Sequence, residues 1–140
     1  MPTVTPPWTY TLQLPHDLRA PGIARATLRT VLAAHDLTQL TPTAELLAAE
    51  LLANAHLHTT GPYALRLRSV ESGRLRVGVW DTDPTVPAGF VLAEGLSVAL
   101  PPEAHAEHGR GLPLVRACAA GWGASVLGGK SGKVLWAECG

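Results

Sequence analysis

The chain has 140 residues, of which 46% are apolar, and its 11 basic and 11 acidic residues give a formal net charge of zero. This length suits a single domain over residues 1–140, and the apolar content excludes a disordered chain. The balanced charge disfavours direct nucleic-acid binding. Because the apolar runs are shorter than about 20 residues and the start lacks signal character, we expect a cytoplasmic protein without a membrane segment.

The first predicted elements are a strand over residues 8–14 and a helix within residues 16–37. "WTYTLQL" alternates and is rich in β-formers, as in an edge strand. The following segment carries apolar residues near helical spacing, with Pro21 in a first turn. The chain is therefore expected to open with one strand and one helix.

A second helix is predicted from the beginning of "TPTAELLAAELLANAHLH" at residue 41. Thr41 is the expected N-cap and Pro42 the first helical residue, and Gly61 and Pro62 stop the helix. Its middle is so apolar that almost no water-facing side is expected.

Two hairpins complete the expected sheet. Residues 63–71 and 75–81 alternate around a Ser-Gly turn, and residues 124–129 and 133–139 flank "GKSG". Between the hairpins, residues 82–110 form an irregular stretch typical of a lid, and "GRGLPLVRACAAGWG" (109–123) passes from loop into helix. This order predicts an α/β two-layer sandwich, with a mixed, mostly antiparallel sheet and helices on one face.

Glu50 and Asn54 are the two polar residues of the apolar second helix. They are four residues apart, so their side chains lie on one face, one turn from each other. An amide oxygen can bind Mg²⁺, and a nearby carboxylate can act as a general base. Taken alone, the pair is more simply explained as a cap or an ordinary buried hydrogen bond than as a magnesium and base site.

The histidines and cysteines do not predict a zinc site or a redox site. His56 and His58 are two apart and face different sides of a helix, although His58, one turn beyond Asn54, could approach phosphate. Cys118 falls in an apolar run, which predicts a buried, unreactive thiol, and with Cys139 it makes no metal-type spacing.

Two later stretches support a nucleotide site. Asp81 ends a predicted strand, where its carboxylate can accept a hydrogen bond from an exocyclic amino group. Gly109 and Gly111 precede a predicted helix, whose free amide groups can receive phosphate. Each signal alone is weak, but both follow the Glu/Asn helix in order.

The motifs "ELLANA" (50–55), "VWDTDP" (79–84), "GRGLPLVRACAAGWG" (109–123) and "GGKSGKVLWAE" (128–138) together resemble the histidine-kinase-like ATPase domain of the GHKL superfamily. The likeness spans nearly the whole chain. Within the superfamily, the chain is similar above all to the anti-sigma-factor serine kinase branch, especially the small stand-alone ATP-binding regulators of actinomycetes. The resemblance implies a Bergerat-type ATP-binding fold, with ATP and Mg²⁺ as cofactors.

The resemblance also implies a role for each matching residue. Glu50 would be the general base, Asn54 the magnesium ligand and Asp81 the adenine-contacting acid. The cofactor-binding loop would be Gly109, Arg110, Gly111 and Leu112, and residues 82–110 would be the ATP lid. The expected activity is that of an ATP-dependent serine/threonine kinase, acting on an anti-anti-sigma-type protein and so controlling a sigma factor, with a possible homodimer.

Three residues depart from the family pattern. Asp83 and Pro84 follow Asp81 where the broader family has glycines, and Val134 replaces a threonine that helps to hold adenine through water. These departures leave open a second function. The chain would then be a non-catalytic or nucleotide-free regulator that acts by binding a partner.

Overall fold

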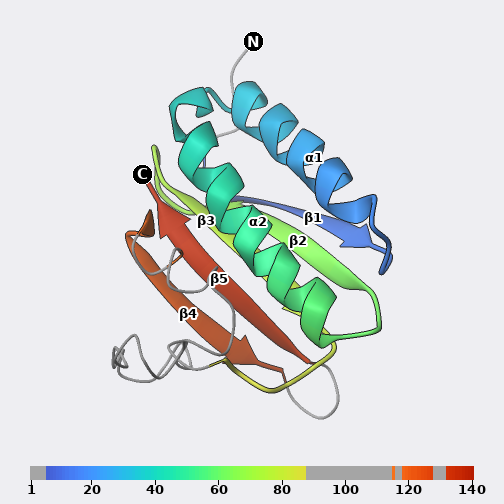
Figure 1. Ribbon diagram of the computed structural model, residues 1–140. Helices are drawn as coiled ribbons and strands as arrows, with labels where there is room; N and C mark the ends of the chain where they lie inside the picture. Colours follow the sequence, from blue (N-terminus) through green and yellow to red (C-terminus); the bar gives the residue numbers. More distant parts are fainter. Residues whose placement is uncertain (1–5, 88–114, 116–117, 128–131) are drawn as a thin grey trace.

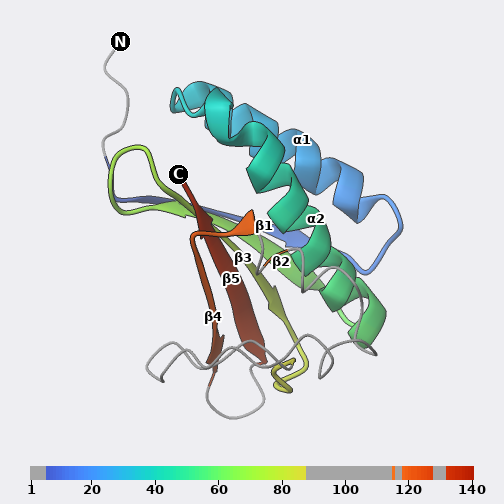
Figure 2. The ribbon, with the colours of Figure 1, turned by 60° about the vertical axis from the view of Figure 1, so that its left-hand side comes forward.

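The computed structural model describes residues 6–87, 115, 118–127 and 132–140 of the chain. They form an open five-stranded sheet with two helices on one face (Figures 1 and 2). In chain order the elements are β1 (Trp8–Leu14), α1 (Ala20–Ala34), the 3₁₀ turn η1 (Thr38–Leu40), α2 (Thr41–His58), β2 (Tyr63–Ser69), β3 (Leu75–Asp81), β4 (Gly121–Val126) and β5 (Lys133–Cys139).

The sheet has the order β1-β2-β3-β5-β4, and each of the four pairings between these strands is antiparallel. The two-layer α/β arrangement is therefore as predicted, but the expected mixed sheet is wrong for the described strands. A single helix between two strands usually makes them parallel, but here two helices, α1 and α2, connect β1 to β2. The second helix restores the direction that the first reverses, so β2 returns antiparallel to β1.

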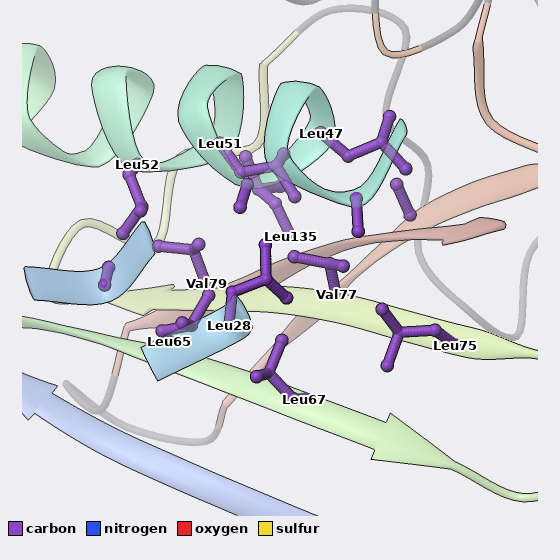
Figure 3. Packing of buried hydrophobic residues seen from close by; sticks show 14 of the residues in the cluster. Leu28, Leu47, Leu51, Leu52, Leu65, Leu67, Leu75, Val77, Val79 and Leu135 are labelled. Atoms are coloured by element: carbon purple, nitrogen blue, oxygen red, sulfur yellow. The ribbon is translucent and has the colours of Figure 1, made fainter. Parts of the chain in front are cut away.

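The core lies between the sheet and the two helices (Figure 3). Along α1 the buried residues recur at helical spacing: Ala20, Ala24, Leu28, Val31 and Leu32. Along each strand, alternate residues face the helices, so β3 contributes Leu75, Val77 and Val79 and β5 contributes Leu135 and Ala137. Full burial of such a side chain stabilises the fold by about 1.5–3 kcal/mol.

Helix α2 corrects two expectations. The turn η1 runs directly into it, so the backbone at Thr41 is already helical (φ −54°, ψ −48°), and neither Thr41 nor Leu40 supplies a side-chain cap. The helix also has a water-facing side, since Ala49, Ala53 and Leu57 are exposed. The apolar pattern concealed this side because alanine is compatible with either environment.

Strand β4 begins earlier than predicted. Gly121, Trp122 and Gly123, expected at the end of a helix, already pair with β5. Gly123 lies under the indole of Trp136, where an added Cβ would stand 2.4 Å from the ring. Cys118, expected to be buried, is exposed just before this strand. The Gly-Trp-Gly sequence matches no helix or strand pattern, which explains the error at the start of β4.

The antiparallel register brings the end of β3 to the start of β5. Asp81 is the Cα partner of Lys133, and α2 packs across both strands. No helix in the described part of the chain combines the length and apolar character that a bilayer span requires. The fold thus gathers residues of α2, β3 and β5 at one end of the sheet.

Candidate functional site

A cavity of about 310 Å³ lies beside the C-terminal half of α2. Its lining comes from α2, from the segment that follows β3 and from the first residue of β5: Asn54, His58, Asp83, Thr85, Val86, Pro87 and Lys133. A volume of this order is typical of a small-molecule site. Most of the lining side chains are polar or charged, and Val86 and Pro87 are the apolar ones among the described lining residues.

Asn54 supplies the most informative polar group of the cavity. The residue is only 7% exposed, and no described residue hydrogen-bonds its side-chain amide. Buried amides in native proteins are nearly always hydrogen-bonded, since an unmet group costs about 1–3 kcal/mol. Among the described residues nothing occupies its oxygen or its N–H₂ group, so both can meet a ligand in the cavity.

Lys133, which lines the cavity, forms a buried ion pair with Asp81, which does not. The Lys133 ammonium donates to both carboxylate oxygens of Asp81, at 2.8 and 3.0 Å, and to the backbone carbonyl of Asp83 at 2.8 Å. The backbone N–H of Asp83 donates to Asp81 as well, at 2.9 Å. The network fixes the chain where it leaves β3.

This network bears directly on the predicted adenine contact. Asp81 is 1% exposed, does not line the cavity, and accepts three hydrogen bonds from within the protein. A base would have to displace the Lys133 ammonium before its amino group could reach this carboxylate. The role of Asp81 in adenine binding stays a prediction, and it now includes this rearrangement.

Asp83 places a negative charge at the cavity wall. Its pKa is held below the usual range, chiefly by the backbone N–H of Thr85, which donates to the carboxylate at 2.9 Å, with smaller effects from Lys133 and His58. The carboxylate is thus ionised at neutral pH. A cation, or the amino edge of a base, is favoured beside it over a bare phosphate.

The two histidines of α2 face different sides, as predicted. His58 lines the cavity with Asn54, one turn away. His56 instead makes a 2.9 Å hydrogen bond with the Tyr63 hydroxyl and stacks on His16, whose Nε2 lies 2.8 Å from the His56 carbonyl. His56 therefore ties the end of β1 to α2, while His58 is available to a ligand.

Other predicted site residues are not brought together in the cavity. Glu50 is half-buried on α2 and does not line it. Val134 lies on the opposite face of the sheet from Lys133, so its missing hydroxyl leaves this cavity unaltered. The predicted loop, Gly109, Arg110, Gly111 and Leu112, lies outside the described residues, as does the expected lid beyond Pro87.

Sequence reasoning missed Lys133 and the wall formed by residues 85–87. A signal for Lys133 was present, because it opens a strand as Asp81 closes one. Two such residues meet when their strands pair antiparallel. The alternating pattern does not show which strand pairs with which, however, so the Asp81–Lys133 contact could not be predicted from the sequence.

The chain matches no family model and no curated protein. In the described ranges, no three His, Cys, Asp or Glu side chains gather closely enough to hold a metal ion by themselves. A metal at Asn54 would therefore need most of its ligands from water or from a bound anion, which is the usual coordination of Mg²⁺ in nucleotide sites.

Proposed function

We propose that this chain is a Mg-ATP-binding regulatory protein with a Bergerat-type fold, and that it phosphorylates a serine or threonine of a small antagonist protein. One observation carries the proposal: a buried amide, Asn54, borders a cavity of suitable size and has no described hydrogen-bond partner. The order of the sequence motifs supports the same reading. By that resemblance, the target is an anti-anti-sigma-type protein, whose phosphorylation releases or traps a sigma factor.

Asn54 and Glu50 have distinct roles in this proposal. The Asn54 oxygen would provide one magnesium ligand, and the ion would supply positive charge that offsets phosphate charge. Glu50, one turn earlier on α2, takes the proton of the attacking hydroxyl. The hydroxyl oxygen bonds to the γ-phosphorus, the bond to the bridging oxygen breaks, and ADP leaves. By the sequence resemblance alone, the amides of residues 109–111 and the Arg110 side chain would stabilise the phosphate charge.

Binding is tested by calorimetry on Asn54→Leu. This variant removes the amide but keeps its volume, and it leaves no buried polar group unpaired, so the protein should stay folded. We expect heat of binding from Mg-ATP with the wild type and none with Asn54→Leu, whereas Asn54→Asp, which keeps an oxygen ligand, retains binding. Equal affinity in wild type and Asn54→Leu would contradict the role of Asn54.

Phosphoryl transfer is tested separately with Glu50→Gln. The variant is expected to bind Mg-ATP normally and to lose transfer of labelled phosphate to a co-purified partner, because glutamine cannot accept the proton. Glu45→Gln, on the same helix in an ion pair with Arg29, is the matched control and should keep transfer. Normal transfer by Glu50→Gln would exclude Glu50 as the base.

A second candidate function is favoured by the Lys133–Asp81 pair. A regulator that binds a partner without using nucleotide needs no free acid for adenine, and here the acid is already neutralised by a lysine with 1% exposure. Calorimetry separates the two candidates, since this regulator gives no heat with either Mg-ATP or Mg-ADP. The homodimer that the resemblance implies is tested independently by analytical ultracentrifugation.

A further inference from the structure

The sheet face opposite the helices has an unusual composition. No described helix covers it (Figure 2). Because side chains alternate along each strand, the strand residues that are not in the core lie on this face. Two hollows of about 130 and 230 Å³ also lie on it. The hollows share Arg66 and Val134 and have small residues, among them Gly78 and Ala64, in their lining.

Arginines concentrate on this face. Arg68 on β2 stands directly opposite Arg76 on β3, which in turn stands opposite Glu138 on β5. Arg66 lies two residues along β2 from Arg68, on the same side. Like charges directly opposite each other across two strands are destabilising. Among the described residues of this cluster, three guanidinium groups thus stand beside one carboxylate, although the net charge of the protein is zero.

Only one of these arginines has an anionic partner among the described residues. Arg76 donates to Glu138 at 2.8 and 3.0 Å, and its guanidinium lies 3.9 Å from the centre of the Trp136 ring. Arg66 and Arg68 are exposed and form no ion pair with a described carboxylate. Two positive charges on this face therefore have no counter-charge among the residues that the structure describes.

The geometry favours carboxylates over stacked bases as the counter-charge. The Trp136 ring is covered on one side by Arg76 and lies against Gly123 of the neighbouring strand, so it offers no free platform to a base. The guanidinium group of an arginine, by contrast, can bind a carboxylate through two parallel hydrogen bonds. A second copy of this chain would bring the same arginines face to face and is repelled.

We propose that this sheet face, centred on Arg66 and Arg68, docks an acidic segment of a partner protein. Carboxylates of the segment pair with the two arginines, and its apolar parts lie over the hollows beside Val134 and Trp136. The surface is on the other side of the sheet from the Asn54 cavity. The proposal therefore holds or fails independently of nucleotide binding.

The test uses the full chain and a fluorescent glutamate-rich peptide of about seven residues, the length of a typical strand. Fluorescence anisotropy should detect binding that weakens as salt is raised, with no binding of the matching glutamine-rich peptide. Arg66→Glu and Arg68→Glu should each reduce affinity by about tenfold or more. Arg25→Glu, which makes the same charge change on α1, should leave affinity unchanged.

Three results would overturn the proposal. One is absence of peptide binding to the wild type at low salt. Another is an equal loss of affinity in Arg25→Glu, which would reveal only a general charge effect. The third is tighter binding of single-stranded oligothymidylate than of the peptide with the same dependence on Arg66 and Arg68, which would make the face a nucleic-acid site. Circular dichroism checks that each variant is folded.

Discussion

Asp81 and Lys133 form an ion pair that is almost completely removed from water, each side chain being 1% exposed. Moving the two charges out of water costs several kcal/mol per ion, and their mutual attraction offsets this only with good geometry. Here the ammonium donates to Asp81 and to the Asp83 carbonyl, so all the strong contacts are made within the protein. Each charge offsets the cost of burying the other, so removing one of them alone should destabilise the fold.

Lys133→Met should therefore destabilise the fold by about 3–5 kcal/mol, because it leaves a buried carboxylate without a counter-charge. Urea unfolding measures the loss. The double variant Asp81→Asn with Lys133→Met should recover most of it, since no buried charge remains. A cost below about 1 kcal/mol for Lys133→Met, the range of exposed ion pairs, would show that the pair is not buried in solution.

The two cysteines should differ sharply in reactivity. Burial raises the pKa of the Cys139 thiol to about 11, so it stays protonated near neutral pH, whereas Cys118 is exposed. A thiol reagent at pH 8 should modify one cysteine quickly in the native protein and both in urea. Cys118→Ser should abolish the fast phase, and a fast phase that survives this change would contradict the assignment.

The raised pKa of Cys139 also predicts a pH effect on stability. The unfolded chain ionises this thiol near its usual value of 9.0, while the folded chain holds the proton to about pH 11. The folded state thus binds more protons in that window, so stability should fall as pH rises from 9 to 11. Cys139→Ala should flatten this part of the curve in chemical denaturation.

At the scale of single residues, the sequence predicted contacts that depend on helical spacing and missed those that depend on strand pairing. Asn54 and His58 share a cavity because they are one turn apart on a helix. The Asp81–Lys133 contact joins residues 52 positions apart in the sequence. Nothing in the local pattern encodes such a pairing.

At the scale of the secondary-structure elements, the start of β5 tolerates little substitution where it meets the end of β3. Gly132, just before β5, has φ +86°, and an added Cβ would stand 1.9 Å from the Asp81 carbonyl oxygen. Only glycine can adopt this conformation and allow so close a backbone approach. Gly132 thus permits Lys133 to lie directly opposite Asp81.

Gly132→Ala should destabilise the protein by several kcal/mol, while Gly73→Ala should cost only about 1 kcal/mol. Gly73 is the matched control because its φ, +81°, is nearly the same, yet its Cβ would meet nothing within 4 Å. The difference between the two variants in urea unfolding isolates the backbone clash. Equal losses would mean that the Asp81 carbonyl moves aside without cost.

The strands were easier to predict than the element boundaries. β1 and β3 begin and end where alternation of apolar residues begins and ends, and Gly73 correctly indicated the turn before β3. The first residue of β4 was wrong because Gly121, Trp122 and Gly123 match no strand pattern. The first residue of α2 was wrong because the turn η1 runs into this helix without a break. A local pattern cannot resolve such a junction, since both neighbours satisfy it.

At the scale of the molecule, the two faces of one sheet are put to different uses. The helix-covered face holds the core and, at one end, the Asn54 cavity, while the other face carries the arginine row. Sequence alternation predicted two faces but not the charge imbalance of the second. That imbalance depends on which strands become neighbours, as Arg68 and Arg76 do.

Ligand binding should stabilise the whole molecule through the first face alone. At a Mg-ATP concentration of about 100 times Kd, linkage adds about 2.7 kcal/mol to the free energy of unfolding and raises Tm. Thermal unfolding should show this rise in the wild type and in Arg66→Glu, but not in Asn54→Leu. Loss of the rise in Arg66→Glu would show that the two faces are coupled.

The Asp81–Lys133 pair also constrains how the sequence can evolve. A single replacement at either position leaves an unmet charge in the core, so a lineage can change the pair only through a destabilised intermediate or by two nearly simultaneous steps. Among related chains, the two positions should vary together, either as an acid with a base or as two neutral residues. Gly132 should remain fixed beside them, because its constraint comes from the backbone and not from the charges.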